Sequence, residues 1–179
     1  MTRYFAFLRA INVGGHTVKM EALKRIFEEF GYAGVETFIA SGNVIFETGQ
    51  GSVTETENRI EAGLAGVLGF KSAVFLRTLP ELPQIAACQP FPEDQFARAA
   101  AFNVAFLKEP PQVAAIERLM GLQNEIDAFA MVGREVYWLC RVRQSESRFA
   151  NTVLEKALGQ PSTMRQVSTL RRLVDKYKN

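Results

Sequence analysis

Two loops near the start of the chain carry residues that could bind an anion. The first follows an apolar segment and Arg9, reads Asn12-Val-Gly-Gly-His16, and contains the glycine pair Gly14 and Gly15. Successive glycines between a strand and a helix can direct backbone N–H groups at a phosphate or carboxylate. A guanidinium such as that of Arg9 can hold such a group bidentately. The spacing matches no established phosphate-binding loop, so a tight structural turn is the alternative.

The second loop, Ser41-Gly42-Asn43, offers a hydroxyl and an amide. A catalytic serine needs a base within hydrogen-bond reach and a group that orients the base. His16 is the only histidine of the chain, and no acidic residue is placed to orient it. The loop therefore indicates binding more than catalysis, although serine, glycine and asparagine are also common turn residues.

A third polar group lies toward the C-terminus and combines two guanidiniums with three hydroxyls. Its members are Ser147, Arg148, Thr163, Arg165 and Thr169. Together they could form a phosphate-binding corner. The alternative is that Ser147 caps a helix while the arginines face solvent.

The sequence offers no pattern for a metal, a cofactor or a membrane. Cys88 and Cys140 lie far apart, and with a single histidine they provide neither a metal-ligand spacing nor a disulfide framework. Every stretch of 18 residues contains a charge, and the N-terminal segment lacks the pattern of a secretion signal. We therefore expect a cytoplasmic protein without metal, cofactor or membrane partner. The sequence gives no indication of the oligomeric state.

The charge is distributed unevenly although the net charge is only +2. Residues 1–140 hold 12 basic and 16 acidic side chains, whereas residues 141–179 hold 9 basic and 3 acidic ones. A basic C-terminal segment can attract phosphate-bearing partners, including nucleic acid. A solvated helical face is the alternative.

The elements that position these loops occur in the same order twice. The first unit is predicted to contain a strand at 4–10, a helix from Met20, strands at 35–40 and 44–48, a helix capped by Ser52 and Glu55 and ended by Gly69, and a strand at 71–77. This is the β-α-β-β-α-β order of ferredoxin-like domains. At Ser41-Gly42-Asn43 we expect a two-residue hairpin loop with glycine first.

The second unit repeats this order after residue 100. We expect strands at 101–108, 126–132, 135–141 and 163–165, helices from Pro111, from Ser145 or Ser147 to Gly159, and at 168–176. Residues 38–46 align on 129–137 without a gap, which places Gly42 on Gly133.

These patterns predict an α+β protein with an internal duplication. Each half is a ferredoxin-like unit with a mostly antiparallel sheet and helices on one face. The predicted boundaries are residues 1–88 for the first unit with a short helix, 89–100 for a proline-containing linker, and 101–179 for the second unit with a basic C-terminal helix.

Several of these motifs resemble the bacterial family known as domain of unknown function 1697. The shared segments are Leu8–Gly15, Ser41–Phe46, Phe70–Arg77, Phe102–Leu107, Val136–Trp138, Ser147–Arg148 and Thr163–Arg165 with Thr169. The resemblance covers almost the whole chain and implies two ferredoxin-like repeats, with no established activity or cofactor. The family usually has glycine at the position of Ala10, which suggests that this chain needs no special φ there. Gln166 stands where asparagine is usual.

The function predicted from these residues is the binding of a small phosphate- or carboxylate-bearing ligand in a groove between the two repeats. One wall would contain Arg9, Asn12, Gly14, Gly15, Ser41, Gly42 and Asn43. The other would contain Ser147, Arg148, Thr163, Arg165 and Thr169.

Two alternatives from other classes stay open. One is an enzyme acting on a phosphorylated or acyl substrate, with Arg9 and Asn43 stabilising developing charge, although no base is evident. The other is a protein that contacts RNA through its basic C-terminal segment, although the aromatic consensus of RNA-recognition strands is absent.

Overall fold

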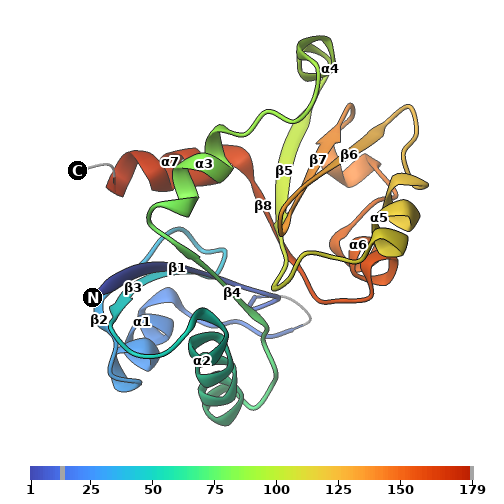
Figure 1. Ribbon diagram of the computed structural model, residues 1–179. Helices are drawn as coiled ribbons and strands as arrows, with labels where there is room; N and C mark the ends of the chain where they lie inside the picture. Colours follow the sequence, from blue (N-terminus) through green and yellow to red (C-terminus); the bar gives the residue numbers. More distant parts are fainter. Residues whose placement is uncertain (13–14, 178–179) are drawn as a thin grey trace. The chain divides into compact units, whose positions relative to one another are not determined.

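Figure 1 shows the computed structural model of the chain, which describes residues 1–12 and 15–177. The chain divides into two compact units, Met1–Leu82 and Pro83–Asn179. Within the described residues, each unit contains one four-stranded antiparallel sheet. The predicted α+β fold with duplicated halves is confirmed.

The first unit is a sheet with strand order β2-β3-β1-β4 and two helices on one face (Figure 1). Its elements are β1 (Thr2–Leu8), α1 (Met20–Glu29), β2 (Ala33–Thr37), β3 (Asn43–Thr48), α2 (Val53–Leu68) and β4 (Val74–Thr78). Helix α3 (Glu81–Ala87) follows. Alternate strand residues such as Ala6, Leu8 and Phe46 pack with Phe27 of α1 and Leu64 of α2 in a buried core.

The ends of α2 form as the sequence predicted. The Ser52 hydroxyl accepts from the Glu55 backbone N–H at 3.2 Å, and the Glu55 carboxylate accepts from the Ser52 backbone N–H at 2.7 Å. These two bonds satisfy N–H groups that the first helical turn leaves without partners. Gly69 ends the helix with φ of 75°, a conformation that glycine adopts without steric cost.

The second unit has the corresponding strand order β6-β7-β5-β8, and α5 and α6 lie together on one face of its sheet (Figure 1). Its elements are α4 (Glu93–Ala97), β5 (Ala101–Phe106), α5 (Val113–Met120), β6 (Asp127–Val132), β7 (Glu135–Cys140), the 3-10 turn η1 (Gln144–Glu146), α6 (Asn151–Leu158), β8 (Thr163–Gln166) and α7 (Val167–Tyr177). The segment predicted as a linker, 89–100, thus holds α4. The core of the second unit contains Leu119, Trp138 and Leu154.

The two units correspond through the ends of their central strands. Leu8 N–H donates to Gly42 O at 2.9 Å, and Leu107 N–H donates to Arg134 O at 3.0 Å. Gly42 therefore corresponds to Arg134, and the gapless alignment of Gly42 on Gly133 was wrong by one residue.

The hairpins explain this shift. In the second unit, Val132 pairs with Glu135, so the hairpin loop contains two residues, Gly133 and Arg134, with glycine first as predicted. In the first unit, Phe38 N–H donates to Asn43 O at 3.0 Å, so the loop has four residues, 39–42. The prediction of a two-residue loop there was wrong, and β2 ends at Thr37 rather than at residue 40.

A buried arginine occupies the same position in the last strand of each sheet. Arg77 of β4 pairs with Phe5, and Arg165 of β8 pairs with Val104, at corresponding sites of the central strands. In each case Nη1 donates at 2.8 Å to the carbonyl of the preceding residue. The duplication thus extends to individual side-chain hydrogen bonds.

We expect the capping box of α2 to make the stability of the protein depend on pH. Hydrogen bonds from the Ser52 backbone N–H and side chain lower the pKa of Glu55. A lowered carboxyl pKa contributes stability above the ordinary glutamate pKa of about 4.3 and loses it as the pH falls through the lowered value. We expect Glu55→Gln to be less stable than the wild type at about pH 7. The difference in the free energy of unfolding should become smaller as the pH falls into the acid range.

Urea unfolding at a series of pH values tests this expectation. Glu21→Gln is the matched control, because it removes an acidic group from the first turn of α1, where Lys19 makes no side-chain capping hydrogen bond. A difference between wild type and Glu55→Gln that persists undiminished in acid would contradict a role for the charged carboxylate.

Candidate functional site

Two predicted loops of the first unit lie side by side. Asn12 Nδ2 donates to Ala40 O at 3.1 Å, while Asn12 Oδ1 accepts from Val18 N–H at 2.7 Å. We call residues 9–12, 15 and 39–43 the loop cluster. Gly14, which the sequence placed in the same site, lies outside the described residues. Asn12 uses both ends of its amide to hold backbone, which is a structural role.

Asn43 is the buried centre of the hairpin loop. It is 1% exposed, and its Nδ2 donates to Phe38 O at 3.0 Å and to Ser41 Oγ at 2.8 Å. The amide of Asn43 therefore closes the turn, and it presents a donor to the Ser41 hydroxyl. A donor amide cannot accept the proton that a nucleophilic serine must lose.

The backbone of the loop cluster is strained at two places. Among the described residues, the non-glycine residues with positive φ are Ala10, at 54°, and Ile39, at 50°. The inference that Ala10 needs no special φ was therefore wrong, because its backbone adopts a left-handed conformation. Strain of this kind persists where surrounding contacts over-determine the backbone, and it is frequent at binding sites.

The remaining members of the loop cluster differ in exposure. Arg9 is half-buried; its N–H donates to Ala73 O at 2.8 Å, and its carbonyl accepts from Ser72 Oγ at 2.7 Å. Gly15 is exposed with φ of 85° and open space around it. Next to it, His16 stacks on Phe70 with ring centroids 4.0 Å apart.

The predicted C-terminal group is divided between the two edges of the second sheet. The Ser147 hydroxyl donates to the carboxylate of Asp127 in β6, 2.8 Å from Oδ2, and accepts from Phe149 N–H at 2.9 Å. Thr163 and Arg165 belong to β8, on the opposite edge. Three strand spacings of about 4.8 Å separate these strands, so Ser147 and Arg165 do not share one corner.

Ser147 also does not cap the following helix. That helix, α6, begins at Asn151, and its N-cap residue Ala150 makes no side-chain capping bond. The bond to Asp127 explains the difference, because Asp127 also accepts from Trp138 Nε1 at 2.8 Å and is buried. A buried carboxylate requires such donors, so Ser147 serves Asp127 instead of a helix end.

Arg165 is the most deeply buried of the predicted ligand-binding cations. Burial lowers its pKa to about 10, so the guanidinium stays charged at neutral pH. Its Nη1 donates to Thr163 Oγ1 at 2.9 Å as well as to the strand backbone. Arg148 is exposed, and Thr169 is half-buried in α7.

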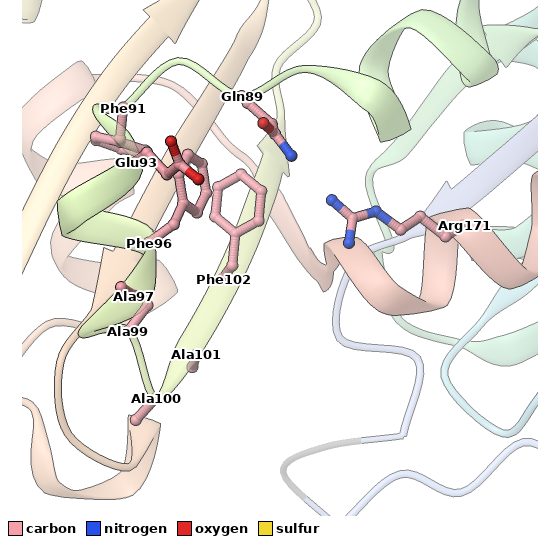
Figure 2. Close-up of a pocket in the computed structure, with 10 residues that line it drawn as sticks. All are labelled: Gln89, Phe91, Glu93, Phe96, Ala97, Ala99, Ala100, Ala101, Phe102 and Arg171. Carbon is pink, nitrogen blue, oxygen red and sulfur yellow. The ribbon is translucent and has the colours of Figure 1, made fainter.

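The second unit contains a pocket that the sequence did not reveal. It has a volume of about 860 Å³ (Figure 2). It is lined by Gln89, Phe91, Glu93, Phe96, Ala97, Ala99, Ala100, Ala101, Phe102 and Arg171. These residues come from the segment before α4, from α4 itself, from the start of β5, and from α7. We call it the Arg171 pocket.

One side of the Arg171 pocket is aromatic. Phe96 meets Phe102 edge to face at 5.0 Å, and Phe91 meets both rings edge to face at 5.8 Å and 6.2 Å. The three rings are half-buried. Phe102 is supported from behind by Tyr137, whose ring stacks at 5.9 Å and whose hydroxyl donates to Ile85 O at 2.9 Å.

The polar side of the pocket holds a guanidinium, an amide and a carboxylate. Figure 2 shows the Arg171 side chain reaching from α7 toward Gln89 and Phe102, with the Glu93 carboxylate beside the rings. Arg171 Nε donates to Ala86 O at 3.3 Å, which anchors the side chain. Within residues 1–12 and 15–177, no hydrogen bond or ion pair occupies the Nη groups of Arg171 or the side chains of Gln89 and Glu93.

The sequence signals for this pocket were weak because its parts are distant along the chain. Phe91 lies between two prolines in the predicted linker, Phe102 reads as an ordinary strand residue, and Arg171 is one of several cations of the basic segment. The available hint was the pair of phenylalanines, Phe91 and Phe96, in a segment expected to be a linker.

The described part of the chain contains no cluster of three or more metal-ligating side chains. Burial raises the pKa of the Cys140 thiol, as expected of a small apolar core residue. Among the described helices, none is both long enough and apolar enough to cross a bilayer.

Comparison with known proteins agrees with this architecture. The chain belongs to the family described as protein of unknown function (DUF1697), whose model matches residues 1–137. It is similar in structure to the conserved bacterial protein SP0830 from Streptococcus pneumoniae, with a TM-score of 0.76 and 23% sequence identity over 97% of each chain. At that identity, the similarity concerns the fold alone. No curated protein matches the sequence significantly.

The packing of the hairpin loop on the preceding loop can be tested at Gly42. A Cβ at this position would lie 2.6 Å from Cγ2 of Ile11, which is buried, and φ is 72°. Gly69 has nearly the same φ, 75°, with no atom within 4 Å. We expect Gly69→Ala to cost about 1 kcal/mol and Gly42→Ala about 1–3 kcal/mol more because of overpacking. Equal losses in urea unfolding would show that the Ile11 contact is unimportant.

The strain at Ala10 predicts a stabilising substitution. Glycine adopts a φ of 54° without a Cβ clash, so Ala10→Gly should leave stability unchanged or raise it by about 1 kcal/mol. The matched control is Ala62→Gly at an exposed interior position of α2, which should cost about 1 kcal/mol. Thermal unfolding of both variants gives the comparison, and loss of stability in Ala10→Gly would contradict the strained conformation.

Proposed function

We propose that this protein binds a small ligand bearing a phosphate or carboxylate in the Arg171 pocket. The observation that carries the proposal is the position of Arg171: this exposed side chain lines a pocket of about 860 Å³, where its Nε is anchored on Ala86 O and its two Nη groups remain available. A guanidinium held in this way can meet an anion with two parallel hydrogen bonds.

The surrounding side chains support an anion at this end of the pocket. The Gln89 side chain lines the same pocket and points toward the Arg171 guanidinium in Figure 2, so its amide adds a neutral hydrogen-bond donor. Glu93, beside the aromatic rings, repels an anion from the other end. The arrangement therefore favours a ligand whose charged group meets Arg171 while its remainder extends toward the phenylalanines.

The loop cluster supports ligand binding less well than the Arg171 pocket does. Its amides, those of Asn12 and Asn43, already hold backbone carbonyls or the Ser41 hydroxyl. Binding an anion through them would cost these hydrogen bonds, which stabilise the protein by about 1 kcal/mol each. The groove that the sequence predicted between the two repeats stays a prediction.

Replacement of Arg171 tests the proposal. Hydrogen bonds to charged groups contribute about 1.5–3 kcal/mol, so Arg171→Gln should weaken binding of inorganic phosphate or ribose 5-phosphate by about tenfold or more. Arg148→Gln, at an exposed arginine outside the pocket, is the control, because it removes the same charge from the protein. Nitrogen–proton NMR spectra report the Gln89 amide and the Arg171 Nε–H directly, and both signals should shift during titration of the wild type.

Two outcomes would contradict the proposal. Unperturbed Gln89 and Arg171 signals at millimolar phosphate and ribose 5-phosphate would exclude the pocket as the anion site. Tight binding of a single-stranded RNA oligonucleotide, with a salt dependence that indicates several phosphate contacts and no effect of Arg171→Gln, would favour the RNA-contacting alternative.

A further inference from the structure

We infer that the ligand of the Arg171 pocket carries a planar aromatic ring together with its anionic group. This inference rests on the proposed function and adds the chemical class of the ligand. It is carried by the arrangement of Phe91, Phe96 and Phe102, which the binding of an anion alone does not require.

The three rings form an aromatic surface on which a further ring can pack. They pack edge to face with centroids 5.0–6.2 Å apart, in the geometry that aromatic quadrupoles favour. Tyr137 stacks behind Phe102 and is itself fixed by its hydrogen bond to Ile85 O. The rings are thus ordered before a ligand arrives, which lowers the entropy cost of binding.

The rings are also partly exposed, and all three line the pocket. Each is half-buried, whereas Phe5, Phe7, Phe46, Phe75 and Phe106 are at most 1% exposed. Covering this apolar surface with a ligand ring is favourable by the hydrophobic effect and by ring–ring contact. A volume of about 860 Å³ is in the range of pockets that hold drug-sized ligands.

The corresponding position of the first unit shows that the aromatic surface is not required by the fold. Phe102 corresponds to Arg3, because Leu107 corresponds to Leu8. Arg3 forms an ion pair with Glu47 at 2.6 Å, and Glu47 corresponds in turn to Leu139, which pairs with Phe102. The same strand position thus carries an ion pair in one unit and a pocket ring in the other.

Matched pairs of ligands separate the ring from the charge. Benzoate is compared with cyclohexanecarboxylate, and adenosine 5′-monophosphate with ribose 5-phosphate, using the Gln89 and Arg171 signals as readout. We expect the aromatic member to bind about 3- to 10-fold more tightly in each pair. Intermolecular NOEs should connect the ligand ring with Phe96 and Phe102.

Phe102→Leu keeps an apolar side chain and removes the ring, so the aromatic preference should fall to about twofold or less while ribose 5-phosphate still binds. Phe96→Leu gives the same test if Phe102→Leu is unstable. Phe70→Leu, at a half-buried phenylalanine of the first unit, is the control and should keep the preference.

The outcomes distinguish this inference from the function on which it rests. Equal affinities within both pairs, with binding that still depends on Arg171, would overturn the aromatic ligand and leave the anion site intact. A preference that survives in both leucine variants would also overturn it. Failure of all four ligands to shift the Gln89 and Arg171 signals would overturn both proposals.

Discussion

Antiparallel pairing of the central strand with two neighbours is the constraint on which the rest of each unit depends. β1 pairs with β3 and β4, and β5 pairs with β7 and β8. Because every backbone group of a buried strand requires a partner, these pairings determine where each loop leaves the sheet. In the second unit, the pairing of Asn103 with Gln166 brings the start of α7, and hence Arg171, to the end of β5 that carries Phe102.

Some polar side chains of the protein are already hydrogen-bonded to other groups of the fold, whereas others remain available to bind a ligand. Asn12, Asn43, Ser147 and Arg165 make short hydrogen bonds to carbonyls, backbone N–H groups or a buried carboxylate. Such bonds are costly to break once their partners are buried. The anchored but incompletely used guanidinium of Arg171 differs from them, and this difference directs the functional proposal to the second unit.

The duplicated units preserve their architecture and differ in their surfaces. The strand order and the buried arginines, Arg77 and Arg165, are common to both. The hairpin loops differ by two residues, and the position that carries an ion pair at Arg3 in one unit carries Phe102 in the other. Sheet pairing and helix packing tolerate these changes, because the changes involve loop residues and a position near the start of the central strand.

Local sequence was sufficient for the order of elements and for several of their ends. The capping box at Ser52 and the left-handed glycines after α2 and α6 depend on residues within a few positions of one another, so they could be predicted. Hairpin loop length, the φ of Ala10 and the partner of Ser147 depend on contacts across the sheet, and these predictions failed. The Arg171 pocket joins side chains from residues 89 to 171, and only tertiary structure brings them together, because strand pairing acts between segments that are remote in the chain.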